Sequence, residues 1–75
     1  MHKVRNEEVM KLFGNNVQRL RIAKGFTQEF LAEEAGISQV QVARIESGKL
    51  NTSISTVVAI SKALGIEISE LFKTM

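Results

Sequence analysis

The segment Thr27–Gly48 reads TQEFLAEEAGISQVQVARIESG, and its pattern predicts two short helices joined by a tight turn. Thr27 supplies a hydroxyl at the start of the first helix, and Ser38 supplies one at the start of the second. Gly36 lies between them and can adopt a positive φ without strain, as such a turn requires. Apolar residues at helical spacing should pack the two helices against each other.

Two helices joined by a turn of this length form a helix-turn-helix, and the second helix of that motif can enter the major groove of DNA. On the second predicted helix, Val42 and Ile45 should point inward. Four residues should face outward: Gln39, Val40, Gln41 and Arg44. Glutamine can pair with adenine, arginine with guanine, and a small apolar side chain can contact the thymine methyl group. These four residues are the predicted base readers, and the alternative is a solvated face of a small helical bundle.

An ordered series of residues carries a resemblance to a known family. Within the segment it comprises Thr27-Gln28-Glu29, Leu31-Ala32, Gly36-Ile37-Ser38, Val42, Arg44-Ile45-Glu46 and Gly48. It continues upstream at Gly14, Arg19-Leu20-Arg21 and Gly25, and downstream at Ala63-Leu64-Gly65-Ile66 and Leu71-Phe72. The series resembles the Cro and phage-repressor type (XRE-like) of helix-turn-helix domain over about residues 10–73. The resemblance implies an all-α, compact, five-helix λ-repressor-like DNA-binding domain with the helix-turn-helix at helices 2 and 3.

The composition limits the classes of protein. A chain of 75 residues is one domain at most, here residues 1–75, and it buries only a modest fraction of its surface. The chain contains no cysteine, and its one histidine, His2, has no second metal ligand nearby in the sequence. No cofactor, metal site or small-molecule ligand is therefore expected. No apolar run reaches membrane-spanning length and no signal-peptide pattern follows the start, so a cytoplasmic location is the default.

The chain is mildly basic, with a formal net charge of +2 at pH 7. A weak overall field supplies only modest non-specific affinity for DNA, which comes from the release of counterions from the phosphate backbone. One copy of the chain would therefore hold DNA poorly. This argument favours a homodimer that reads two half-sites.

The N-terminal third predicts a long helix that starts at Asn6 or Glu7. Its inner face has apolar residues spaced three and four apart, with a glycine that can allow close helix approach: Met10, Phe13, Gly14, Val17 and Leu20. Arg21 also falls on the inner side, where a charge needs a partner. In the resembling family, an arginine at this place pairs with the glutamate that ends the second motif helix, here Glu46. The alternative is two independent surface charges, with Arg21 free to contact phosphate.

Residues around the motif are predicted to contact DNA phosphates: Thr27, Gln28, Ser38, Lys49 and Asn51. In the resembling family, the glutamine at the start of the first motif helix contacts phosphate and can brace the first glutamine of the second helix, here Gln39. An uncharged donor beside the positive end of a helix suits an anion. Lys49 and Asn51 lie in the polar loop after the second helix, where the alternative is simple solvation.

The last third predicts a helix capped by Ser53 or Ser55 and a final short helix over residues 69–73. The inner face of the longer helix should comprise Ile54, Val57, Ile60, Ser61 and Leu64. Further apolar residues lie outside that face or lead into the final helix: Val58, Ala59, Ile66 and Ile68. Surplus apolar area of this kind suits a dimer interface. The alternative is that the final helix folds back and covers it.

The leading function is a sequence-specific, dimeric transcriptional regulator that reads a two-fold double-stranded DNA operator with residues 38–46. Its small size resembles that of restriction-modification controller proteins and of small phage repressors, and the controller type is favoured. It can repress, or activate if Glu29, Glu33 or Glu34 contacts RNA polymerase. The alternative is an antitoxin that binds a toxin protein, for example through Phe30, and autoregulates its operon. An enzyme has little support, because the sequence offers no set of catalytic residues.

Overall fold

The structure is a computed structural model that describes residues 5–74, which form four α-helices and one 3₁₀-helix. The elements are α1 (Glu7–Ala23), α2 (Gln28–Ala35), α3 (Gln39–Glu46), α4 (Ile54–Leu64) and the 3₁₀-helix η1 (Ile68–Phe72). The prediction of an all-α fold is therefore confirmed for this part of the chain. The only histidine, His2, lies outside the described residues.

Each α-helix begins at a side chain that caps it. The capping oxygen accepts a hydrogen bond from the backbone N–H three residues further on, at Asn6 for α1, Thr27 for α2, Ser38 for α3 and Ser53 for α4. Such a cap stabilises the fold by about 0.5–2 kcal/mol, because it satisfies an N–H group that has no partner inside the helix. Gly36 follows α2 with a φ of 73°, which lies in the left-handed region that other residues avoid.

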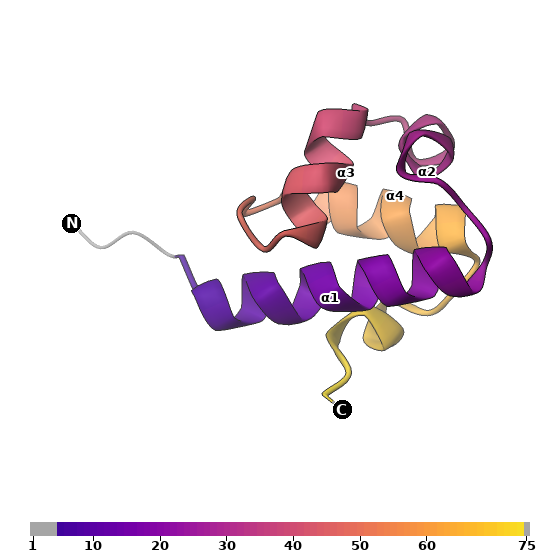
Figure 1. The fold of residues 1–75 in the computed structure, drawn as a ribbon. Helices are drawn as coiled ribbons and strands as arrows, with labels where there is room; N and C mark the ends of the chain where they lie inside the picture. Colours follow the sequence, from indigo (N-terminus) through magenta and orange to yellow (C-terminus); the bar gives the residue numbers. More distant parts are fainter. Residues whose placement is uncertain (1–4, 75) are drawn as a thin grey trace.

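Figure 1 shows α1 as the longest element, with α2 and α3 on one side of it, α4 behind them, and the C-terminal turn on the opposite side of α1. The residues that are completely buried come from all five elements: Val17, Leu31, Val42, Ile45, Ile60, Leu64 and Leu71. The ring of Phe13 on α1 stacks on that of Phe72 in η1, with centroids 5.4 Å apart. The core therefore holds α2 and α3 on a scaffold made by the other elements.

Gly14 permits a very close approach of α1 to the end of α3. A Cβ atom placed on Gly14 would overlap the carbonyl oxygen of Ile45 and lie 3.2 Å from that of Glu46. Both obstacles belong to the main chain, so no side-chain rotation could relieve the overlap. The position of α3 on α1 is therefore set by direct backbone contact.

Asn16 is a buried polar residue that no sequence pattern reveals. The residue is 2% exposed, and its Nδ2 donates hydrogen bonds to the carbonyl oxygens of Leu71 at 3.0 Å and Lys73 at 2.9 Å. Its Oδ1 accepts a hydrogen bond from Arg19 Nη2 at 3.0 Å. Asn16 thus ties the C-terminal segment to α1, and it does so with partners more than 50 residues away along the chain.

The last element differs from the expected fifth helix. It is a 3₁₀-helix at Ile68–Phe72 rather than an α-helix over residues 69–73, and Glu67 provides no side-chain cap. In a segment this short, too few α-helical hydrogen bonds can form to offset the unfavourable nucleation of an α-helix. The 3₁₀ form instead uses bonds between residues three apart, such as that from the Glu70 N–H to the Glu67 carbonyl at 3.0 Å. Burial of Leu71 in the core holds the turn in place.

Ile54 also differs from the prediction that it points inward. It is the first residue of α4 and is 83% exposed. The other residues assigned to the inner face are buried or partly buried: Val57, Ile60, Ser61 and Leu64. Helical spacing predicted the correct face, but the first residue of α4 lies beyond the edge of the packed core.

Candidate nucleic-acid interface

The outer side of α3 carries side chains that project from the fold. Val42 and Ile45 are completely buried in the core, which turns the opposite side of the helix outward. Val40 is 67% exposed, and Gln39 and Arg44 are exposed as well. An amide, a branched apolar group and a guanidinium group at such positions have the chemistry to contact base edges in a major groove.

Gln41 is placed differently from the other three residues predicted to read bases. It is only partly exposed, and its Oε1 accepts a hydrogen bond from the Ser38 backbone N–H at 3.0 Å. Ser38 Oγ in turn accepts one from the Gln41 backbone N–H at 3.1 Å, so the two residues form a reciprocal capping box. Serine followed three residues later by glutamine is a local sequence signal for this arrangement.

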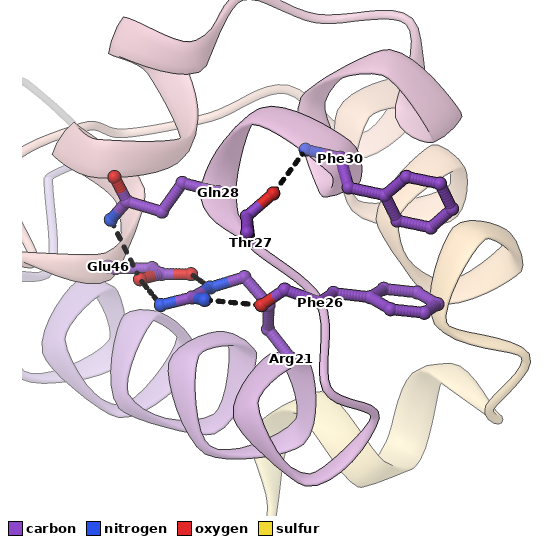
Figure 2. Close-up of polar contacts among 6 residues, drawn as sticks. All are labelled: Arg21, Phe26, Thr27, Gln28, Phe30 and Glu46. Carbon is purple, nitrogen blue, oxygen red and sulfur yellow. Dashed lines mark hydrogen bonds and ion pairs between the residues drawn. The ribbon is translucent and has the colours of Figure 1, made fainter.

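Thr27 and Ser38, two of the residues predicted to contact phosphate, have their hydroxyl groups at the helix starts. Thr27 Oγ1 accepts a hydrogen bond from the Phe30 backbone N–H at 3.0 Å (Figure 2), and both capping residues are exposed. A hydroxyl group can accept and donate at once, so each O–H can still donate to an anion. The partial positive charge at the two helix ends favours an anion at the same places.

A buried ion pair links α1 to the end of α3 (Figure 2). Arg21 Nε lies 2.6 Å from Glu46 Oε2, and Arg21 Nη2 lies 3.1 Å from Glu46 Oε1. Arg21 Nη1 also donates to the carbonyl oxygen of Phe26 at 2.6 Å. The two charged side chains are 11% and 2% exposed, so this arginine is committed to its carboxylate partner and is not a free phosphate ligand.

The side-chain amide of Gln28 joins this ion pair, whereas the resemblance implied that it can brace Gln39. Its Nε2 donates a hydrogen bond to Glu46 Oε1 at 3.0 Å, and the residue is partly buried. The carboxylate of Glu46, at the end of α3, therefore binds one side chain from α1 and one from the first residue of α2 (Figure 2). Besides its side-chain amide, Gln28 has a main-chain N–H at the positive end of α2, and this N–H can face a phosphate.

The loop after α3 presents Lys49 and Asn51. Its shape is held by main-chain hydrogen bonds from Gly48 N–H to the Ile45 carbonyl at 3.0 Å and from Lys49 N–H to the Arg44 carbonyl at 2.9 Å. The Lys49 side chain is exposed, and its ammonium group is suited to phosphate as a point charge. Asn51 is exposed as well and borders a shallow apolar pocket of about 90 Å³.

The residues predicted to form a dimer interface differ in exposure. Val58, Ala59 and Ile66 are partly buried, whereas Ile68 is 43% exposed. Ile54, at 83% exposure, lies four residues before Val58 and therefore on the same side of α4. The apolar surface of α4 is thus larger than expected, and the difference lies at its N-terminal end.

Phe30 forms an aromatic pair at the surface. Its ring meets that of Phe26 edge to face, with centroids 4.6 Å apart, and the residue is 42% exposed (Figure 2).

Over residues 5–74, no group of His, Cys, Asp and Glu side chains could hold a metal ion. Every helix in that range is too short or too polar to span a bilayer.

Comparison with known proteins gives consistent matches. A helix-turn-helix family model, HTH_3, matches residues 17–71. The HTH-type transcriptional regulator y4dJ of Sinorhizobium fredii is 38% identical over 64 residues, which cover 85% of this chain and 83% of that protein. The control protein C.BamHI of Bacillus amyloliquefaciens is 38% identical over 61 residues, which cover 80% of this chain and 75% of that protein. The solved structure of the restriction-modification controller protein C.AhdI from Aeromonas hydrophila matches with a TM-score of 0.82 and 38% identity, over 84% of this chain and 96% of that one.

Proposed function

Because the chain belongs to the HTH_3 helix-turn-helix family of transcriptional regulators, we propose that it is a dimeric regulator that reads a two-fold DNA operator with α3. The observation that carries the proposal is the exposed side of α3. Gln39, Val40 and Arg44 project from a helix whose opposite side is completely buried. Such a helix can enter a major groove and present these groups to base edges.

In this proposal α2 and α3 form the helix-turn-helix, and residues 1–75 act as one DNA-binding domain. The phosphate backbone is held at the helix starts and by the loop after α3, through Thr27, Gln28, Ser38, Lys49 and Asn51. The exposed hydroxyl groups and the positive helix ends support this assignment. These contacts set the register of the protein on DNA, whereas the outer side of α3 supplies the specificity.

The proposal requires two copies of the chain. A net charge of +2 provides little electrostatic affinity, and a two-fold dimer adds a second set of contacts one helical turn, about 34 Å, away. The apolar side of α4 offers a surface for a second copy, with Ile54 and Val58 on it. Ile68 in η1 supplies further exposed apolar area.

The similarity to C.BamHI and C.AhdI favours a controller of restriction-modification genes. The protein would act in the cytoplasm as a binding module without catalytic activity. The carboxylates of Glu29, Glu33 and Glu34 are all exposed on α2 and would be accessible to RNA polymerase at a promoter. Repression would follow from occupation of the promoter itself.

Replacing Arg44 with Ala should weaken binding to the preferred duplex by about 1–3 kcal/mol and relax the preference at one base-pair position. The matched control is Lys49→Ala, which removes a positive charge from a neighbouring exposed loop. Lys49→Ala should weaken binding to all sequences alike. It should also reduce the slope of log affinity against log salt concentration by about 1, as the loss of one phosphate contact does. Selection of bound duplexes from a random pool, followed by titration at several salt concentrations, measures both effects.

Equal weakening on every sequence with Arg44→Ala would show that Arg44 does not read a base. If the unaltered protein enriched no sequence from the pool at low salt, the proposed function itself would be wrong.

Replacing Ile54 with Glu should convert the dimer into a monomer. A carboxylate at the first position of α4 is compatible with the fold because it lies at the positive helix end, but burial between two copies would leave it unpaired. Ile22→Glu is the matched control, since Ile22 is also an isoleucine at the surface, 60% exposed on α1. Sedimentation equilibrium of both variants reports the mass, and an Ile54→Glu dimer as stable as the unaltered one would exclude this surface.

A further inference from the structure

The hydrogen bond between Gln41 and Ser38 restricts what Gln41 can do on DNA. A bidentate pair with adenine needs both the amide oxygen and the amide nitrogen of a glutamine. The amide oxygen of Gln41 is already bound to the Ser38 backbone N–H at 3.0 Å, and the side chain is only partly exposed. Gln39 belongs to the same helix, two residues earlier, and its side chain is exposed.

Release of Gln41 toward a base would damage the start of α3. The Ser38 N–H would lose its acceptor in a place that the DNA would cover and shield from water. The second half of the capping box, from the Gln41 backbone N–H to Ser38 Oγ at 3.1 Å, depends on the same local geometry. The cap therefore competes with base contact for the Gln41 side chain.

The choice of glutamine at this position also fits a helix that meets DNA. Glutamate and glutamine both serve as the last residue of a capping box. The first turns of α1 and α2 contain the acidic residues Glu7, Glu8 and Glu29, whereas the first turns of α3 and α4 contain none. Glutamine closes the cap without placing a negative charge beside the phosphates that the start of α3 would face.

We propose that Gln41 is a positioning residue that fixes the start of α3, and that Gln39, Val40 and Arg44 read the bases without it. The inference rests on the proposed function, because it concerns how α3 is presented to DNA. Its consequence is that the operator tolerates any base pair at the position nearest Gln41. Specificity in each half-site is then concentrated in three side chains.

Three variants test this inference: Gln41→Ala, Gln41→Glu and, as the matched control, Gln39→Ala. Gln41→Ala should lower the melting temperature by about 4–8 °C, through loss of half of the cap, and leave the base preferences unchanged. Gln41→Glu should restore the melting temperature and keep the base preferences, while the affinity for every duplex falls on the order of fivefold at low salt through repulsion from phosphate. Gln39→Ala should keep the melting temperature and lose the preference at one position.

A new or lost base preference at one position in the Gln41 variants would overturn the inference, as would a melting temperature that Gln41→Ala leaves unchanged. The failure of the proposed function gives a different result, because the unaltered protein would then select no sequence. The melting temperatures of Gln41→Ala and Gln41→Glu still decide, in that case, whether Gln41 holds the start of α3.

Discussion

Replacing Glu46 with Ala should lower the free energy of unfolding by about 3–5 kcal/mol, because it leaves the Arg21 guanidinium buried without its carboxylate. The Glu46 side chain is 2% exposed and accepts hydrogen bonds from Arg21 Nε, Arg21 Nη2 and Gln28 Nε2. Small domains have a total stability of about 5–15 kcal/mol, so this loss is a large part of the whole. Urea denaturation followed by circular dichroism measures it.

The double replacement Arg21→Leu with Glu46→Leu is the control for this effect. Removing both charges together leaves no unpaired ion, and apolar residues in place of a buried pair are often neutral or stabilising. The double variant should therefore unfold at a higher urea concentration than Glu46→Ala. A denaturation midpoint of Glu46→Ala equal to that of the unaltered protein would show that the ion pair does not stabilise the fold.

Replacing Gly14 with Ala should destabilise the protein by about 1–3 kcal/mol or more, because the added methyl group overlaps main-chain atoms of α3. The Cβ atom would meet the carbonyl oxygens of Ile45 and Glu46, which can move only if the helix moves. Intrinsic helix propensity acts in the opposite direction and favours Ala over Gly by roughly 0.5–1 kcal/mol. A lower melting temperature would therefore show that the overlap with α3 dominates, and a higher one that helix propensity dominates.

Asn15→Ala is the control for Gly14→Ala, because Asn15 is the next residue on α1 and is exposed. Its change in stability should stay within about 0.5 kcal/mol. The Gly14 variant should also bind the preferred duplex more weakly, since α3 has to shift to make room. An unchanged or raised melting temperature for Gly14→Ala would contradict the close contact between α1 and α3.

The local features of the fold could be predicted because they depend on residues a few positions apart. Thr27 and Ser38 cap helices as expected, since each hydroxyl bonds an N–H only three residues away. Gly36 adopts the predicted positive φ. The resemblance to a helix-turn-helix family is confirmed by the family model and by relatives at 38% identity.

The non-local features were harder to derive. Asn16 bonds two carbonyl groups of the C-terminal segment, and no periodicity encodes a contact across 55 residues. Helical spacing places Arg21 on the inner side of its helix, where a charge needs a partner, but only the resemblance identifies Glu46 as that partner. The exposure of Ile54 depends on where the core ends, which a single helix does not reveal.

The residues assigned to DNA contact remain predictions, and two of them show how a local pattern can have a second meaning. The resemblance implies that Gln28 contacts a phosphate and can also brace Gln39, whereas in the structure its side-chain amide donates a hydrogen bond to Glu46. Gln41 was assigned to base reading from its outward position, although the serine three residues before it already predicted a cap. In both cases a polar side chain near the motif found an acceptor or donor within the protein.

The contact of Gly14 with the end of α3, together with the Arg21–Glu46 ion pair, leaves α3 little freedom to tilt or slide. In the proposed complex, a helix anchored in this way could not follow an irregular groove, so the deformation needed for a close fit would fall on the DNA. Flexible pyrimidine–purine steps bend at lower energy than stiff A-tracts. Two promoters with the same contacted bases should therefore be occupied to different extents when the untouched base pairs between the half-sites differ in stiffness.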